Sequence, residues 1–363
     1  MITALILLVA VTSAPIIFGI VAKNRRNSSG TIVSSHIVGL SCSLIALTVV
    51  TFLSLRFGSF QVSWMTAWDA IFDYDSTIQG QIVVRELRLP RTFLGLAAGS
   101  SLAVAGALVQ GVTRNSLAGP GILGINQGAA FAVVTAIFLA DIVSPKGYVW
   151  FAFIGATIAS VLVYSVAHFG PGGATPIKLV LSGVIVTALL GSWTSALLLL
   201  DLETLDEARF WLAGSISGRG IEEVYFLFPF ILVSLFVAVL MGRQVNVLNL
   251  GEDIAASMGQ RMNLVRILAG LIVIILSGSA VAIAGPIAFV GLAVPHIVRS
   301  LVGPDYRWIL LYCVILGPCL LLGADIVGRL IVRPSELQVG IVTAAVGAPF
   351  LIYLVRFTKI GQV

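Results

Sequence analysis

Three arginines stand at the start of a long apolar stretch. Residues 85–96 read "RELRLPRTFLGL", in which Arg85, Arg88 and Arg91 are three residues apart and Glu86 is the only acid. An arginine at the centre of a bilayer costs about 2.5–3.5 kcal/mol on insertion scales. The sequence leaves two interpretations open: the side chains reach into the headgroup layer, or they form a basic docking patch for an acidic partner.

A pair of oppositely charged residues lies near the other end of the chain. Asp325 and Arg329 are four residues apart in an apolar stretch, so they fall on one face of a helix and can pair with each other. Ionisable residues inside membrane helices pair together or line a pathway. The apolar stretches carry no further series of acids suited to proton coupling, which makes an ion-coupled secondary transporter the less favoured alternative.

Several catalytic motifs are absent from the sequence. There is no G-x-x-x-x-G-K-[ST] phosphate loop, and His36, His168 and His296 lie far apart without a metal-binding context. No G-x-S-x-G motif marks a nucleophilic serine. We therefore expect no enzyme activity, no metal site and no cofactor on this chain. If ATP drives its function, ATP and Mg²⁺ bind to a separate ATPase chain.

The composition defines the environment of these residues. Of the 363 residues, 58% are hydrophobic and 10% are charged, and the mean hydropathy is +1.07. Soluble domains carry about 25% charged residues, so lipid is the main solvent of this chain. The net charge of +5 includes no basic run suited to nucleic acid. The composition predicts an all-α polytopic membrane protein.

Eleven stretches approach the roughly 20 apolar residues that a membrane span needs. They are 2–22, 31–55, 91–112, 121–140, 147–167, 178–200, 222–241, 264–284, 287–301, 308–326 and 338–355. The first has no basic start and is followed by "KNRRN", so we interpret it as an extra membrane helix rather than a signal peptide; a dispensable extension is the alternative. The chain then divides into an extra N-terminal segment with a basic cytoplasmic loop, 1–30, and one transmembrane domain, 31–363.

Lysine and arginine counts indicate the orientation. If "KNRRN" is cytoplasmic and the spans alternate, 12 of the 21 lysines and arginines are cytoplasmic and 9 are outside. This difference has the sign that the positive-inside rule requires. The three arginines of "RELRLPR" then lie on the outer side, against the local bias, so they need an explanation beyond topology.

A short internal sequence repeat suggests a transporter architecture. "GSSLAVAG" (99–106) and "GSAVAIAG" (278–285) match in length and at most positions, and they fall in spans that should cross the membrane in opposite directions. Inverted repeats are typical of transporters that alternate access. In the first of these spans Gly95, Gly99, Ala103 and Ala107 recur every four residues, which predicts a smooth face for a neighbouring helix.

Two segments on the expected cytoplasmic side have possible roles. In "LNLGEDIAASMGQR" (248–261), Asn249 can cap a short helix with Glu252 and Asp253 in its first turn, and Gly259 can end it. Ile254, Ala255 and Met258 would form its apolar face. This helix is either an ordinary turn or a knob for a cytoplasmic partner.

The second segment, "HFGPGGATPIK" (168–178), contains helix-breaking glycines and prolines. It is either a connector or a flexible gate.

Six ordered blocks together resemble the FecCD/BtuC-type permease subunits of type II ABC importers, which carry iron–siderophores, haem and cobalamin. The blocks are "RLPRTFLGLAAGSSLAVAGALVQGVTRNSLAGPGILGINQGAA", "RFWLAGSIS", "LNLGEDIAASMG", "GPIAFVGLAVPHIVR", "GADIVGR" and "ELQVGIVTAAVGAPFLIYL". The resemblance covers about residues 40–356 and is strongest to ferric-siderophore permeases of the ferric-enterobactin type. Cobalamin or haem import is the alternative within the family.

The resemblance implies about ten core helices per subunit, arranged as an inverted repeat, in the cytoplasmic membrane of a bacterium. It implies three kinds of protein partner: an ATP-binding subunit pair, an extracytoplasmic substrate-binding protein and a second permease subunit, for which we favour a heterodimer. It assigns binding-protein docking to Arg88, Arg91 and Arg329, and leaves Arg85 as a bystander. ATPase coupling is assigned to Asn249, Gly251, Glu252, Asp253, Ala255, Met258 and Gly259, and a cytoplasmic gate to Gly172, Gly173, Thr175 and Pro176.

Overall fold

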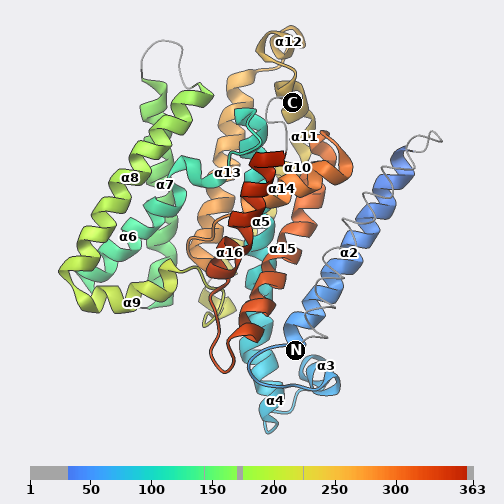
Figure 1. The fold of residues 1–363 in the computed structure, drawn as a ribbon, viewed down its shortest axis with the longest axis vertical. Helices are drawn as coiled ribbons and strands as arrows, with labels where there is room; N and C mark the ends of the chain where they lie inside the picture. The colour runs from blue at the N-terminus through green and yellow to red at the C-terminus, as the bar shows by residue number, and fades with distance from the viewer. Residues whose placement is uncertain (1–31, 143, 170–174, 224, 358–363) are drawn as a thin grey trace.

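The computed structural model describes residues 32–142, 144–169, 175–223 and 225–357. The long helices of this part of the chain run side by side along one axis (Figure 1). They are α2 (Ile32–Arg56), α5 (Leu89–Thr113), α6 (Ile125–Ala140), α7 (Pro145–His168), α8 (Pro176–Leu200), α10 (Phe228–Leu240), α13 (Met262–Ala284), α14 (Val290–Val302), α15 (Tyr306–Ile331) and α16 (Val339–Phe357). Each of the ten spans expected after residue 30 therefore contains a helix, which confirms the all-α fold. The extra segment 1–30 lies outside the described residues.

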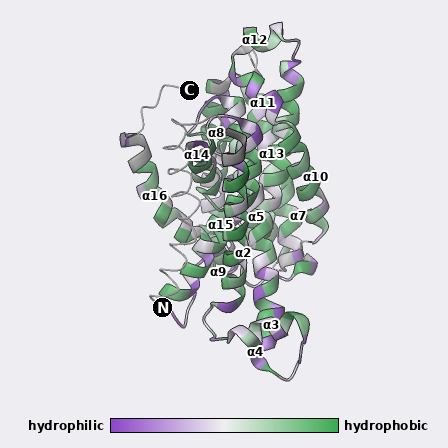
Figure 2. Ribbon diagram, turned by 90° about the vertical axis from the view of Figure 1, so that its right-hand side faces the viewer, coloured by the Kyte–Doolittle hydropathy of each residue, from purple (hydrophilic) through white to green (hydrophobic). Residues whose placement is uncertain are grey.

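The helices differ in how much of a membrane they can cross. Six described helices are long and apolar enough to span one, and α10 with α11 (Gly242–Asn249) makes a seventh, bent by 49°. The helices α6, α14 and α16 are apolar but shorter. Hydrophobic residues dominate along the bundle, and hydrophilic residues gather toward its two ends (Figure 2). The described part of the chain therefore has the construction of a multi-pass membrane protein.

Helix α5 is the centre of the bundle, because 89% of its apolar 18-residue stretch is buried inside the protein. Its predicted smooth face is confirmed, because it packs closely on α15. A Cβ added at Gly99 would lie 2.7 Å from the backbone of Pro318, and one added at Gly317 would lie 2.7 Å from the Cβ of Ala103. A closer approach occurs against α14, where a Cβ at Gly106 would lie 1.7 Å from the carbonyl oxygen of Gly291.

The two repeated sequences, 99–106 and 278–285, lie on adjacent helices, α5 and α13, that run in opposite directions. The end of α13 lies at the turn that follows Trp211, where Ser215 donates its backbone N–H to the carbonyl of Ala284 (2.7 Å). The end of α5 lies at the other side of the bundle, where Asn249 reaches the carbonyl of Gly111 (3.3 Å). The inverted orientation predicted for this repeat is therefore confirmed.

Shorter helices cover the two ends of the bundle. The helices α3 (Trp64–Phe72) and α4 (Gln79–Ile82) lie at one end, and α12 (Glu252–Ser257) lies at the opposite end (Figure 1). The amphipathic helix α9 (Leu202–Leu212) follows α8 and is capped by the Asp201 carboxylate, which accepts from the N–H of Thr204 (2.9 Å). None of these short helices was among the predicted spans, because each is too short to cross a membrane.

The structure corrects part of the prediction for residues 249–259. Asn249 is the last residue of α11 and donates to the carbonyl of Val245 (2.8 Å), so it does not cap the next helix. That helix, α12, begins at Glu252 and follows Gly251, whose φ of +115° favours glycine. Of the three residues predicted to form one apolar face, Ala255 is fully buried, whereas Ile254 and Met258 are 50% and 62% exposed. Gly259, at φ +76°, ends the helix as predicted.

The start of α8 follows from its sequence. The Thr175 hydroxyl accepts the N–H of Lys178 (3.4 Å) as an N-cap, and Pro176 occupies the first helical position, which needs no N–H donor. The predicted gate residues Gly172 and Gly173 lie outside the described residues.

Candidate functional site: a buried arginine–carboxylate network

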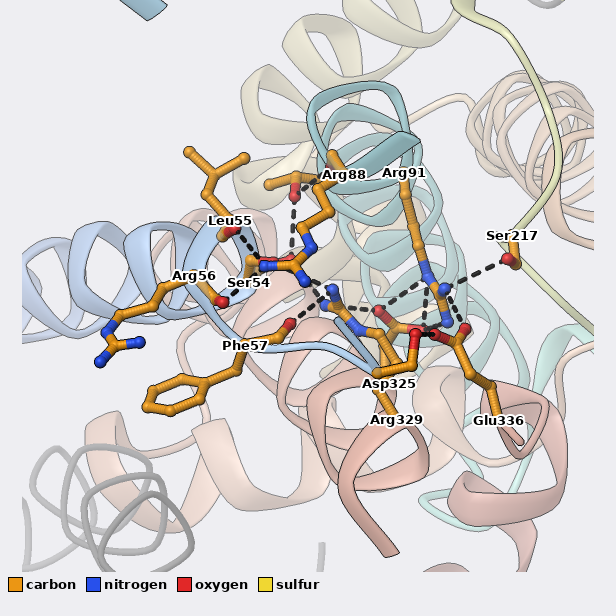
Figure 3. A network of polar contacts seen from close by, with 12 residues as sticks. Ser54, Leu55, Arg56, Phe57, Arg88, Arg91, Ser217, Asp325, Arg329 and Glu336 are labelled. Carbon is orange, nitrogen blue, oxygen red and sulfur yellow. Dashed lines mark hydrogen bonds and ion pairs between the residues drawn. The ribbon is translucent and has the colours of Figure 1, made fainter. Parts of the chain in front are cut away.

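The sequence-predicted arginines meet at the end of the bundle that carries α3 and α4. The π-helical turn η1 (Val83–Arg88) runs directly into α5, so Arg88 ends one element and Arg91 begins the next. Arg329 comes from the last turn of α15, and Asp325 lies one turn before it. The loop between α15 and α16 adds Glu336. Four elements thus bring one set of charges together (Figure 3).

Arg91 is held by two carboxylates on opposite sides. Its Nε donates to both oxygens of Asp325 (3.1 Å each) and its Nη2 to Oδ1 (2.6 Å). Its Nη1 donates to Glu336 Oε2 (2.6 Å) and to the hydroxyl of Ser217 (3.1 Å). This forked geometry uses the planar guanidinium as a bridge between α5, α15 and two loops.

Arg329 is the most deeply buried of the three arginines, with 1% of its surface exposed. It pairs with Asp325 at 2.8 Å, so the predicted pair four residues apart exists. Its Nη1 donates to the carbonyls of Ser54 and Phe57 (2.9 Å each), and its Nη2 donates to the Ser54 hydroxyl (2.9 Å). The side chain therefore ties the end of α2 to α15.

Arg88 binds backbone oxygens rather than a carboxylate. Its Nη1 donates to the carbonyls of Leu55 (2.9 Å) and Arg56, and its Nη2 donates to the carbonyl of Phe60. These carbonyls lie at the end of α2 and just beyond it, where helical oxygens have no partner within the helix. Arg88 thus satisfies the end of α2 and is itself 5% exposed.

Glu336 is the accessible part of the network. Its side chain is 28% exposed, whereas that of Asp325 is fully buried. Burial is the largest single influence and acts to raise the pKa of Glu336. The hydrogen bond and charge of Arg91, with smaller contributions from Ser59 and Arg329, together outweigh burial, and the pKa lies below its ordinary value of 4.5. The Ser59 hydroxyl also donates to its Oε1 (3.1 Å). The Glu336 carboxylate is therefore held in its charged form.

A polar cavity of about 400 Å³ adjoins this pair. Arg91, Glu336, Ser217 and Arg219 line it, together with residues of α7, α9 and the loops at this end of the bundle. Among the three predicted docking arginines, Arg91 is the one that lines this cavity. Arg91 and Glu336 are therefore the members of the network that border this cavity, where Glu336 occupies Nη1 of Arg91.

The structure separates Arg85 from the other arginines. Its side chain is exposed, and its guanidinium lies over the ring of Tyr74, 4.3 Å from the centroid. This cation–π contact stays within the α3–α4 end and does not join the network. The interpretation of Arg85 as a bystander agrees with this position.

Sequence reasoning identified three arginines and Asp325 but missed how they combine. It did not predict the pairing of Arg91 with Asp325, which lies 234 residues away, or the part played by Glu336. One signal was available: an aspartate in an apolar stretch needs a cation beside it, and two charged partners can share one buried carboxylate. The network can hold charge and accept an acidic group, but it includes no nucleophile beside a general base.

Comparison with known proteins supports the permease interpretation. Residues 44–357 match the model of the FecCD transport family. The chain is 40% identical over 323 residues to the "Probable siderophore transport system permease protein YfiZ" of Bacillus subtilis (strain 168), covering 89% of this chain and 97% of that protein. It is 41% identical over 330 residues to the ferric enterobactin transport system permease protein FepD of Escherichia coli (strain K12), with 90% and 98% covered.

A solved structure agrees with the fold. It is described as an inward-facing conformation of a metal-chelate type ABC transporter, and it matches with a TM-score of 0.76 at 29% identity, covering 88% of this chain and 98% of that one. The family match includes all four of Arg88, Arg91, Asp325 and Arg329, and the relatives align over nearly their whole length. This chain therefore belongs to the FecCD transport family.

Proposed function

We propose that this chain is the permease subunit of an ATP-driven importer that moves a ferric siderophore across the cytoplasmic membrane of a bacterium. The observation that carries the proposal is the likeness, over almost the full length, to permeases named for siderophore and ferric-enterobactin transport. In this function residues 31–363 form the permease domain and 1–30 add a further segment. The chain supplies a path and moving surfaces, and the ATPase chains supply hydrolysis.

The arginine network is the proposed landing site for the substrate-binding protein. Arg91 makes the direct contact, because it lines the 400 Å³ cavity at this end of the bundle. All three arginines are buried, with Arg88, Arg91 and Arg329 at 5%, 8% and 1% exposed, but Arg88 and Arg329 do not line this cavity; they support docking by holding α2, α5 and α15 in place. Charge pairs across such an interface mainly set the encounter rate and the register of the two proteins.

The opposite end of the bundle is the proposed contact for the ATPase pair. Helix α12 projects there (Figure 1), and Ile254 and Met258 are 50% and 62% exposed. Leu250, just before the helix, is 57% exposed. An apolar knob of this kind can insert into a groove on a partner. Gly251 and Gly259 set the two ends of the knob, and Glu252 and Asp253 are its first residues.

A second permease subunit would complete the path. Within this chain, the apolar 18-residue stretch of α8 is only 22% buried, and the corresponding stretch of α2 is only 28% buried. Either lipid or another subunit must cover these surfaces, and we propose a related but different permease on one of them. The segment that leads into α8 through Thr175 and Pro176 would then gate the cytoplasmic mouth of the path.

Reconstitution tests this function directly. The chain is co-purified with its ATPase and second permease and placed in liposomes with the binding protein. It is supplied with radioiron-labelled ferric enterobactin, ferric hydroxamate or haem, or with radiocobalt-labelled cobalamin. We expect uptake of a ferric siderophore that requires both ATP and the binding protein. Uptake by this chain alone, driven by an ion gradient, would favour a secondary carrier. ATP-dependent uptake restricted to cobalamin or haem would keep the family assignment and overturn the substrate.

A further inference from the structure

A second cavity lies away from the arginine network, toward the end of the bundle that carries α12. It has a volume of about 610 Å³ and lies between α5, α7, α13, the start of α8 and the short turn η2 (Pro120–Leu123). This size is typical of small-molecule sites. The proposed docking and coupling surfaces do not use it.

The inner wall of this cavity is apolar. Leu108, Val109, Ile122, Leu179 and Ile274 line it, with further apolar residues of α7 and α13. Two hydroxyls in the lining are already satisfied by their own helices: Thr113 donates to the carbonyl of Val109 (2.7 Å), and Ser160 donates to that of Ala156 (2.8 Å). They offer little to a polar ligand, so the wall suits hydrocarbon.

One end of the cavity is polar and carries positive charge. Asn263 and Arg266 lie in the first turns of α13, and His168 is the last residue of α7; all three line the cavity. Deeper along α13 the lining residues are apolar or glycine as far as Ile274. Charge therefore gathers at the helix ends, and hydrocarbon surface lies toward the middle of the bundle.

The length of the cavity matches one leaflet of a bilayer. From Asn263 to Ile274 the lining extends over twelve residues of α13, and the eleven steps between them span about 16 Å at the rise of an α-helix. Half of the roughly 30 Å hydrocarbon core is about 15 Å. A wall of this length, with a cation at the end nearer α12, has the dimensions and the polarity of a lipid molecule.

The side of the cavity opens toward the outer surface of the bundle. Val161, Ile267 and Leu271 belong to its lining and are 53%, 48% and 50% exposed. They lie on α7 and α13, within helices long and apolar enough to span a membrane. A lipid chain can enter sideways between these helices without crossing a polar layer.

We propose that this cavity binds one anionic phospholipid, with an acyl chain along α13 and its phosphate at Arg266, His168 and Asn263. The inference depends on the chain lying in a membrane and does not depend on what the protein transports. Juxtamembrane cations attract anionic headgroups, so the headgroup preference should be measurable.

Two substitutions test the two halves of the site. A Cβ added at Gly270 meets no atom within 4 Å, so Gly270→Leu fills cavity space without a backbone clash. Arg266→Gln removes the positive charge at the polar end. Gly220→Leu is the matched control. Gly220 also has room for an added Cβ, but it lies in a loop and does not line the cavity.

The intact permease assembly is exchanged into nanodiscs of equal phosphatidylglycerol and phosphatidylcholine, released, and analysed by native mass spectrometry for retained lipid. We expect wild type and Gly220→Leu to retain phosphatidylglycerol over phosphatidylcholine, Gly270→Leu to retain several-fold less of both, and Arg266→Gln to retain both equally. Thermal unfolding verifies that each variant is folded.

Three results would overturn the proposal. One is wild-type protein without retained lipid, as when another subunit fills the cavity in the assembly. Another is retention without headgroup preference. The third is a folded Gly270→Leu protein that retains as much lipid as wild type. If the first result arises because wild-type protein retains the chelate in place of lipid, the cavity belongs to the transported molecule.

Discussion

Arg91 and Asp325 lie 234 residues apart in the chain and form a forked pair, with Nη2 to Oδ1 at 2.6 Å and Nε to both carboxylate oxygens at 3.1 Å. Asp325 also pairs with Arg329 at 2.8 Å and is fully buried. One carboxylate therefore pairs with two buried guanidinium groups, and it joins the beginning of α5 to the end of α15. We therefore expect that charge to contribute strongly to the stability of this end of the bundle.

Asp325→Asn should destabilise the protein strongly. It leaves Arg91 and Arg329 buried with only Glu336 to offset them, and removal of one partner of a buried ion pair costs about 3–5 kcal/mol. We expect a large fall in the thermal unfolding temperature in detergent. Asp206→Asn is the matched control. Asp206 pairs with Arg209, but their side chains are 67% and 57% exposed, and exposed pairs contribute about 0–1 kcal/mol. Equal effects of the two substitutions would contradict the network.

The close approach of α5 and α14 gives a second prediction. Gly106→Ala would place a Cβ 1.7 Å from the carbonyl oxygen of Gly291, so the two helices must move apart. Overpacking of this kind costs about 1–3 kcal/mol. Gly270→Ala on α13 is the control, because no atom lies within 4 Å of its added Cβ, and we expect it to be neutral or slightly stabilising. Thermal unfolding compares the two, and a harmless Gly106→Ala would argue against this contact.

Apolar length predicted the helices of this fold well, because each core span has to exclude backbone groups from lipid. It missed α3, α4 and α9, which lie at the ends of the bundle and need no such length. Glycine and alanine spacing located the contact face of α5, because small residues fix where backbones can meet.

Side-chain partners were harder to predict than helices. The pairing of Asp325 with Arg329 follows from their spacing, but the bond to Arg91 depends on which helices become neighbours. Asn249 is the clearest miss: its type suits an N-cap, but it is the last residue of α11 and its amide binds the carbonyls of Val245 and Gly111 instead. Local propensity was overruled there by a tertiary contact.

The pair between Glu336 and Arg91 should depend on pH. The pKa of Glu336 is below its ordinary 4.5, since burial, which raises it, is outweighed by the hydrogen bond and charge of Arg91 together with Ser59 and Arg329. A lowered pKa in the folded state adds stability that is fully present above the unfolded value and is lost as pH falls through the folded value. The unfolding temperatures of wild type and Glu336→Gln should therefore differ by a constant amount above about pH 4.5 and converge at lower pH. A difference that grows on acidification would contradict this linkage.

Docking on Arg91 gives a prediction about the binding protein. Arg91→Gln should lower the association rate of the binding protein at least tenfold, because the charge that lines the outer cavity is lost. Fluorescence-detected size exclusion selects protein that is still folded before the rate is measured. Arg85→Gln is the control, because Arg85 contacts Tyr74 outside the network. The rate for wild type should also fall as salt rises; a rate that Arg91→Gln leaves unchanged would remove Arg91 from the interface.

The exposed side chains of α12 give the last prediction. Ile254→Glu and Met258→Glu place charges on side chains that are 50% and 62% exposed, so the fold should tolerate them while an apolar contact with the ATPase should not. Met65→Glu makes the same change on α3, where Met65 is 71% exposed at the opposite end of the bundle. We expect the first two variants to lose co-purifying ATPase or its stimulation by the binding protein, and Met65→Glu to retain the ATPase. If all three retain coupled hydrolysis, α12 is a surface turn and the ATPase binds elsewhere.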